Sequence, residues 1–270
     1  FIVADGMGGG VEGEKASRRA IDTFSATLYN KRGLLRALEN SHDEVIQTQI
    51  KNLLEQAIHA ANQEILRIKR SIGPKVSMGT TLSALLLLGQ RGVLAHIGDS
   101  RIYRVRYREL SQISMDHSLV AQQVREGLIT PAQAEISPFR NVLIQAIGKE
   151  DKITPQIEFI DLEMGDQFLL CSDGLSNYLT ESEIITVLGE PEGHRIVPRL
   201  IDCANARGGR DNITAIAIRL SSAEHYQPTT EVDIGRGFGA APLLRGLKTS
   251  ETTRLLQLGK THDYIEGEKI

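Results

Sequence analysis

The sequence predicts an α+β fold, a four-layer α-β-β-α sandwich in which two central antiparallel sheets are flanked by helices. Helical periodicity dominates the first 70 residues, and apolar, β-rich runs then follow one another. Strand-rich and helix-rich blocks are therefore separated along the chain, whereas a doubly wound parallel sheet requires strict alternation.

Two long helices are expected before residue 80. Apolar residues recur every three or four positions over residues 14–29 and again from about Glu44 to Arg70. Both patterns are amphipathic, so each helix is expected to cover a sheet.

The strands are expected in two blocks. Between Thr80 and Arg106 the apolar runs break at residues 89–92 and at Gly98-Asp99, and a meander of consecutive antiparallel strands is the simplest arrangement. Later strands are expected at residues 156–161, 167–172 and 213–220, and helices near 181–188 and 194–206.

The segment from 118 to 150 is expected to hold short helices and loops. Ser118 is a candidate N-cap for a helix over residues 119–126. Thr130 is a second candidate N-cap, because Pro131 then occupies the first helical position.

Four aspartates share a local setting that suits a site for hard cations. Asp5, Asp173 and Asp211 each stand beside a glycine or an asparagine where an apolar run meets a turn, and Asp99 has the same setting. A carboxylate where a buried strand gives way to a tight turn is fixed by the sheet yet exposed at its rim. Oxygen ligands favour Mg²⁺ or Mn²⁺, so the set predicts a centre that holds more than one metal ion.

Composition narrows the classes of function. The 270 residues can hold one large domain plus an appendage, and the hydrophobic content of 41% supports a packed core. A net charge of −3 gives no electrostatic footprint for nucleic acid or an anionic membrane. The longest aliphatic run, residues 84–88, is too short to span a bilayer.

The two cysteines indicate a reducing compartment. Cys171 and Cys203 lie in apolar surroundings and lack the spacing of metal ligands. We therefore expect a cytoplasmic location and no structural disulfide.

Six short motifs occur in an order that resembles one known family. The chain looks like a bacterial member of the PP2C (PPM) family of metal-dependent serine/threonine phosphatases, and the resemblance covers roughly residues 1–220. The motifs that carry it are Val3-Ala4-Asp5-Gly6-Met7-Gly8-Gly9, Gly79-Thr80-Thr81-Leu82, Gly98-Asp99-Ser100-Arg101, Asp116-His117-Ser118, Ser172-Asp173-Gly174-Leu175 and Asp211-Asn212-Ile213-Thr214.

The resemblance implies roles for the acidic residues in binding two or three Mn²⁺ or Mg²⁺ ions. Asp5 would bridge two ions, and the backbone carbonyl of Gly6 would ligate the second. Asp173 and Asp211 would complete the first. Asp99, sharing Asp173, resembles the ligand of a weaker third ion. Residues 118–150 correspond to the family's flap beside the active site.

The chain departs from the family pattern in three places. Met7 stands where many eukaryotic relatives have a histidine proposed as a general acid, and Arg108 stands where a hairpin glycine is usual. The chain also opens at Phe1 inside an expected strand, so an N-terminal truncation is expected. The family's phosphate-gripping arginine and one acidic ligand would lie upstream of Phe1.

Several other residues have two interpretations. His117 could contact substrate or pin the start of the flap, and His96 is expected to be a satisfied core or rim histidine. Arg207 and Arg210 could steer a phosphopeptide or remain solvated.

The domain organisation changes after Leu220. Residues 1–220 are expected to form the phosphatase-like domain, and 221–250 a flexible linker. Residues 251–270 faintly resemble the opening of a cyclic-nucleotide-binding-like domain, and a tail with one short helix is the alternative.

The resulting functional hypothesis is hydrolysis of phosphoserine and phosphothreonine in proteins by metal-activated water, with Asp5, Asp173 and Asp211 as the catalytic set. The expected partners are phosphorylated proteins and a cognate serine/threonine kinase, and the domain is expected to be a monomer. The alternative is a non-catalytic domain of the same fold that binds a partner or phosphoprotein. Carboxylates that repel one another without cations argue against that alternative. A two-metal hydrolase of small phosphate esters also stays open.

Overall fold

The computed structural model describes residues 1–9, 11–39, 43–73, 76–209 and 211–221. The described residues up to Leu220 form one compact unit. Apart from Ser221, the predicted linker and the predicted tail lie outside the described residues.

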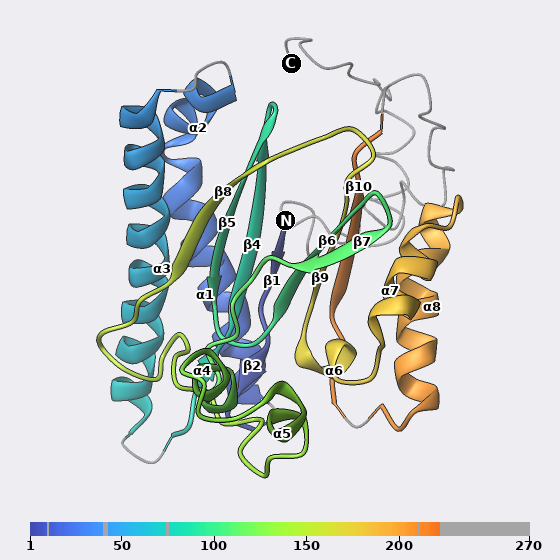
Figure 1. Cartoon of the computed structure of the whole chain (residues 1–270). Helices are drawn as coiled ribbons and strands as arrows, with labels where there is room; N and C mark the ends of the chain where they lie inside the picture. The colour runs from blue at the N-terminus through green and yellow to red at the C-terminus, as the bar shows by residue number, and fades with distance from the viewer. Residues whose placement is uncertain (10, 40–42, 74–75, 210, 222–270) are drawn as a thin grey trace, which may run out of the picture. The chain divides into compact units, whose positions relative to one another are not determined.

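Two four-stranded antiparallel sheets form the centre of this unit (Figure 1). The first sheet has the strand order β1 (Ile2–Val3), β4 (Leu82–Leu88), β5 (Arg91–Ile97) and β8 (Gln156–Asp161). The second has the order β10 (Ala215–Arg219), β9 (Gln167–Cys171), β6 (Arg101–Arg106) and β7 (Glu109–Gln112). A short antiparallel ladder joins β2 (Gly6–Met7) to β3 (Gly79–Thr80).

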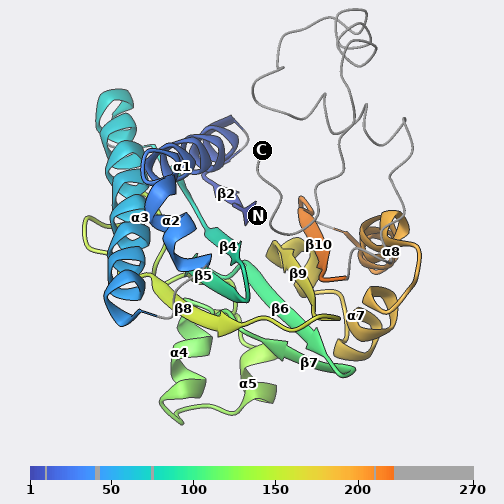
Figure 2. The ribbon, with the colours of Figure 1, turned by 90° about the horizontal axis from the view of Figure 1, so that it is seen from above.

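Helices cover the outer face of each sheet (Figures 1 and 2). The first sheet carries α1 (Val11–Tyr29), α2 (Arg32–Glu39) and α3 (Glu44–Ile72). The second sheet carries α7 (Glu181–Leu188) and α8 (Gly193–Ala206). The predicted α-β-β-α sandwich is confirmed.

Apolar side chains fill three layers between these elements. One cluster packs α1 and α3 on the first sheet, and another packs α7 and α8 on the second. Between the sheets lies a third cluster, made of Val3, Leu85, Leu94, Ile102, Phe168 and Leu170. Ser83 and His96 share the inward faces of their strands with Leu85 and Leu94, because side chains alternate along a strand. At this end of the core between the sheets, the polar side chains of Ser83 and His96 replace the apolar ones.

The predicted meander is wrong at Gly98-Asp99. β4 and β5 pair with each other, but β6 pairs with β9 in the second sheet. The chain crosses from the first sheet to the second at Gly98. Gly98 has a φ of 114°, and a Cβ there would lie 2.5 Å from the Thr81 side chain, so this crossing requires glycine. An apolar pattern identifies a strand without identifying its sheet.

The ends of the other predicted helices and strands agree with the structure to within four residues. Two short helices were not predicted. The missing ones are α2 and α6 (Asp173–Ser176). In the hairpin between β6 and β7, Tyr107 and Arg108 have φ values of 52° and 66°. These values are those of a type I′ turn, which Arg108 adopts without the usual glycine.

The flap begins with two capped helices, as predicted. The Ser118 hydroxyl accepts a hydrogen bond of 3.3 Å from Ala121 N at the start of α4 (Leu119–Arg125). Thr130 and Gln133 form a capping box at α5 (Pro131–Glu135).

In the described part of the chain, no helix has the length and apolar character that crossing a lipid bilayer requires. Cys171 and Cys203 are free thiols, and Cys171 is buried.

Candidate functional site

Asp5 follows β1, and hydrogen bonds to the β3–β4 segment fix its backbone. Asp5 N donates to Thr81 Oγ1 at 2.9 Å, and Thr81 N donates to Asp5 O at 2.9 Å. The Thr80 hydroxyl also donates to Asp5 O, at 2.8 Å. The two threonines therefore act as a clamp on the Asp5 turn.

Gly6 is required by the close approach of α1. A Cβ at Gly6 would lie 2.0 Å from Gly13 O, inside any permitted contact. The same approach places the first turn of α1 directly behind the Asp5 turn.

Asp173 and Asp211 are brought together by Ser172. Ser172 N donates to Thr214 O at 3.0 Å, and Thr214 N donates to Ser172 Oγ at 3.1 Å. Gly174 completes the junction, because a Cβ there would lie 2.4 Å from Asn212 O. Residues about forty apart in the sequence thus share one turn region.

Asp99 lies in the crossover between the sheets, next to a strong ion pair. Arg101 Nε and Nη2 donate to the Asp116 carboxylate at 3.0 and 2.8 Å, and Arg101 Nη1 donates to Tyr103 Oη at 3.1 Å. The Ser100 hydroxyl is 2.7 Å from Thr81 Oγ1, which links this crossover to the Asp5 clamp.

The pKa values of Asp5, Asp99 and Asp173 are raised by burial and by the repulsion between these carboxyls. Burial, followed by the charges of Asp173 and Asp211, raises the pKa of Asp5 to about 7. Burial, followed by Asp173 and Asp116, raises the pKa of Asp99 to about 7. Burial and Asp211 also raise the pKa of Asp173, which shares a hydrogen bond with the Asp5 carboxyl. Such a cluster carries stored repulsion that cations would relieve.

The residues present fit hard cations. Asp173 Oδ1 is buried and has no hydrogen-bond partner among the described residues, which is an unsatisfied acceptor facing the cluster. The candidate donors are carboxylate and carbonyl oxygens, the set that Mg²⁺ and Mn²⁺ prefer.

The carboxylates are neighbours without forming a preformed cage. Within the described ranges, no three histidine, cysteine or acidic side chains converge as a complete ligand set. Asp211 accounts for part of this, because it is exposed and its Oδ1 accepts from Asn212 N at 2.8 Å.

A family model for protein phosphatase 2C matches residues 1–213. The chain belongs to the protein phosphatase 2C family.

Relatives and solved structures agree with this membership. Protein phosphatase PhpP of Streptococcus pneumoniae is 33% identical over 226 residues, which cover 83% of this chain and 87% of that protein. The crystal structure of the Mycobacterium tuberculosis serine/threonine phosphatase PstP/Ppp is 37% identical, with a TM-score of 0.69, and covers 82% of this chain and 87% of that one. A structure of the PstP catalytic domain in complex with two manganese ions is 36% identical, with a TM-score of 0.64, over 80% of this chain and 85% of that one.

Two residues of this PP2C-family chain that had two interpretations are held by contacts of their own. His117 Nδ1 accepts from Gly98 N at 3.1 Å, which supports a structural role at the start of the flap. Arg207 forms an ion pair with Glu183 and donates a hydrogen bond to Tyr178 O, and neither partner belongs to the aspartate cluster. Arg210 lies outside the described residues.

Sequence reasoning did not foresee two arrangements around the cluster. One is the Arg101–Asp116 ion pair, whose members both stand in the quoted motifs. The other is the stacking of His96 on His117, with ring centroids 5.2 Å apart. Membership in the motifs was the only available signal for Arg101, Asp116 and His117, and His96 stands outside the quoted motifs.

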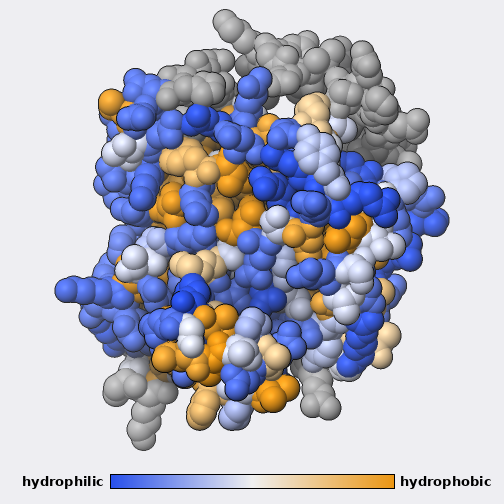
Figure 3. All heavy atoms as spheres, viewed as in Figure 1, coloured by the Kyte–Doolittle hydropathy of each residue, from blue (hydrophilic) through white to orange (hydrophobic). Residues whose placement is uncertain are grey.

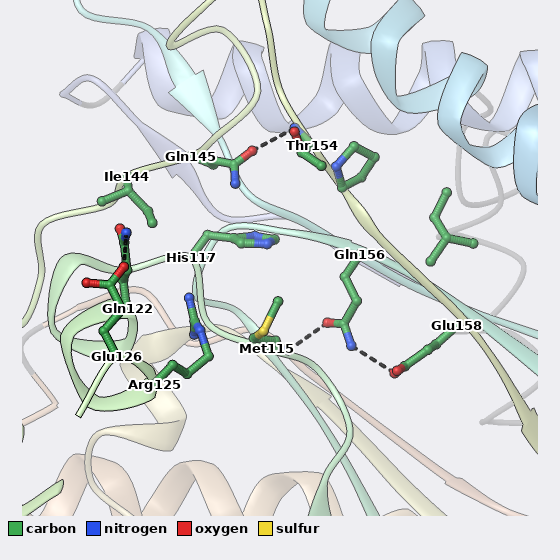
Figure 4. Close-up of a pocket in the computed structure, with 12 residues that line it drawn as sticks. Met115, His117, Gln122, Arg125, Glu126, Ile144, Gln145, Thr154, Gln156 and Glu158 are labelled. Atoms are coloured by element: carbon green, nitrogen blue, oxygen red, sulfur yellow. Dashed lines mark hydrogen bonds between the residues drawn. The ribbon is translucent and has the colours of Figure 1, made fainter. Parts of the chain in front are cut away.

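A cavity lies beside the flap, and none of the predicted ligands lines it (Figure 4). Its volume is about 620 Å³, and it lies between α4 and the start of β8. The His117 ring lines it, with Arg125, Gln145 and Gln156 around it.

Proposed function

We propose that this domain hydrolyses phosphoserine and phosphothreonine monoesters in proteins, in a reaction that depends on Mn²⁺ or Mg²⁺. One observation carries the proposal: carboxyls from distant segments lie close together, so that burial and the charges of Asp173 and Asp211 raise the pKa of Asp5 to about 7. In the described part of the chain, Asp173 Oδ1 also has no hydrogen-bond partner. Cations bound among these carboxylates would offset their mutual repulsion.

The fold fixes the backbone around Asp5 and brings the Asp173 and Asp211 segments together at Ser172. Asp5 and the Gly6 carbonyl would serve two ions, and the threonine clamp fixes the backbone of Asp5. Asp173 and Asp211 would complete one site. Asp99 is proposed for a further ion together with Asp173, whose charge already acts on it.

The cations, when bound, would supply positive charge for the phosphate oxygens and a water molecule acidic enough to ionise near neutral pH. The chain's own contribution is to place acidic oxygens at fixed positions and to keep the Asp5 turn rigid. A preorganised site of this kind lowers the barrier because little reorganisation occurs during reaction.

The partners follow from the proposed reaction. Phosphorylated proteins would be the substrates, and a serine/threonine kinase would make them. The free thiols Cys171 and Cys203 fit a reducing compartment, so we place the domain in the cytoplasm. We also propose that the domain is a monomer. Residues 1–220 would form the catalytic unit, followed by a linker over 221–250 and a further element over 251–270.

The test is the cation dependence of hydrolysis by the native protein. With an aryl phosphate as substrate, we expect turnover with Mn²⁺ or Mg²⁺ and none in excess chelator, with recovery when Mn²⁺ is restored. Full turnover in chelator would refute a metal-dependent reaction. A protein that binds Mn²⁺ and phosphoproteins without turnover would instead support a binding domain.

A further inference from the structure

Two histidines contact the backbone of Gly98, the residue immediately before Asp99. His117 Nδ1 accepts from Gly98 N at 3.1 Å, and His117 N donates to Gly98 O at 2.7 Å. His96 Nε2 also lies 3.1 Å from Gly98 O. The position of Asp99 is therefore set by contacts one residue away.

The protonation of both rings follows from these partners. Gly98 N–H can donate only to a ring nitrogen that carries no proton, so His117 is neutral with its proton on Nε2. His96 is fully buried, with Nε2 3.1 Å from Gly98 O and Nδ1 2.8 Å from the Ser83 hydroxyl. Burial, followed by His117, lowers the pKa of His96 to about 3, so this ring is neutral as well. The stacked pair is thus an uncharged clamp.

His117 also belongs to the flap. Its carbonyl accepts from Ile144 N at 2.8 Å, and Leu119 N donates to Val142 O at 2.8 Å, so the two ends of the segment 118–144 close on this residue. The His117 ring forms part of the wall of the cavity beside α4 (Figure 4). A shift of the flap or an occupant of that cavity would press on the same ring that fixes Gly98.

We propose that His117 is a positioning residue that couples the flap to Asp99 and so sets cation affinity at the site to which Asp99 contributes. Within the described ranges, His117 forms no hydrogen bond with Asp5, Asp173 or Asp211, so affinity for the other cations is expected to be independent of it. The inference rests on the proposed cation cluster.

Two substitutions separate the acceptor from the ring. His117→Phe keeps a ring that can stack on His96 but removes the acceptor for Gly98 N. His117→Asn loses the ring but places an amide oxygen near the former Nδ1. Gln122→Ala is the matched control, because Gln122 lines the same cavity and, among the described residues, its side chain donates a hydrogen bond to Glu126 alone.

The readout is Mn²⁺ binding to the native protein, measured from the electron paramagnetic resonance of free Mn²⁺ without substrate. For His117→Phe we expect the weakest class of sites to lose about tenfold in affinity, as for loss of one buried hydrogen bond, while tighter classes change by less than about twofold. His117→Asn should recover most of the loss, and Gln122→Ala should match the wild type.

Equal weak-site affinity in wild type and His117→Phe would overturn the proposal, as would identical behaviour of folded His117→Phe and His117→Asn. If His117→Phe does not fold, hydrogen exchange of the wild type decides. Filling the weak site with Mn²⁺ should slow exchange in residues 97–101 and 142–147 together, and protection of 97–101 alone would contradict the coupling. A protein that binds no Mn²⁺ would refute the proposed function itself.

Discussion

At the scale of single residues, the site depends on carboxylates that the fold holds against their own repulsion. Burial and Asp211 raise the pKa of Asp173, which means that its ionised form is disfavoured in the folded protein. Its Oδ1 has no partner in the described residues to offset that cost. The residue that we propose as a ligand is therefore a source of instability when no cation is bound.

Asp173→Asn tests this conflict between stability and activity. Turnover should fall by more than about a hundredfold, because loss of a proposed metal ligand costs more than the roughly 10–100-fold typical for loss of a residue that only orients a ligand. The metal-free variant should be more stable than wild type by roughly 1 kcal/mol, since one repelling charge is removed. Urea unfolding in chelator measures the stability, and a less stable variant with normal turnover would contradict both expectations.

Gly174→Ala tests the junction between the Asp173 and Asp211 segments. The added Cβ would lie 2.4 Å from Asn212 O, so the two segments must separate. We expect a loss of roughly 1–3 kcal/mol in unfolding free energy and weaker Mn²⁺ binding. Gly193→Ala is the control, because nothing lies within 4 Å of a Cβ there. Equal stability and Mn²⁺ affinity in the two variants would show that the close approach is unimportant.

At the scale of elements, a buried ion pair ties β6 to the β8–β9 connection. Arg106 Nε and Nη2 each donate to Asp166 at 2.7 Å, and Glu163 N donates to Asp166 Oδ2 at 2.9 Å. Burial opposes ionisation of Asp166, but these hydrogen bonds outweigh it and lower its pKa. The pair lies outside the candidate site, so it can be removed without touching a proposed ligand.

Asp166→Asn should destabilise the domain by about 2 kcal/mol at pH 7, the scale of a hydrogen bond to a charged group. Because the folded pKa is depressed, this stability is present above the unfolded pKa of about 4 and is lost as pH falls through the folded value. The difference between wild type and variant in urea unfolding should therefore shrink below about pH 4. A constant difference down to pH 2 would show that ionisation of Asp166 contributes nothing.

The elements also show where sequence reasoning succeeds and where it stops. Caps such as Ser118 and Thr130 were predicted because they act within four residues of the chain. The crossover at Gly98 was misjudged because it depends on contact with Thr81, which only the folded chain supplies. The helix α6 was missed because its four residues are too few for a periodic pattern.

At the scale of the whole molecule, the sandwich brings separate motifs to one edge. The turn after β1, the crossover between β5 and β6 and the turn after β9 supply Asp5, Asp99 and Asp173, and the segment before β10 supplies Asp211. Asp5, Asp99 and Asp173 each stand just after a strand, whereas Asp211 stands before one, and the motif set named all four. It did not predict the stacked histidines or the Arg101–Asp116 pair, which arise from the packing of the flap on the crossover.

Phosphate release from a phosphothreonine peptide, by the native protein and by Asp173→Asn at equal concentration, tests the central claim most directly. We predict Mn²⁺-dependent release by the wild type and by Gly193→Ala, and no release by Asp173→Asn or by any of the three in excess chelator. Release by Asp173→Asn at the wild-type rate, or by the wild type in excess chelator, would contradict the assignment of this cluster as the metal centre of a phosphoprotein phosphatase.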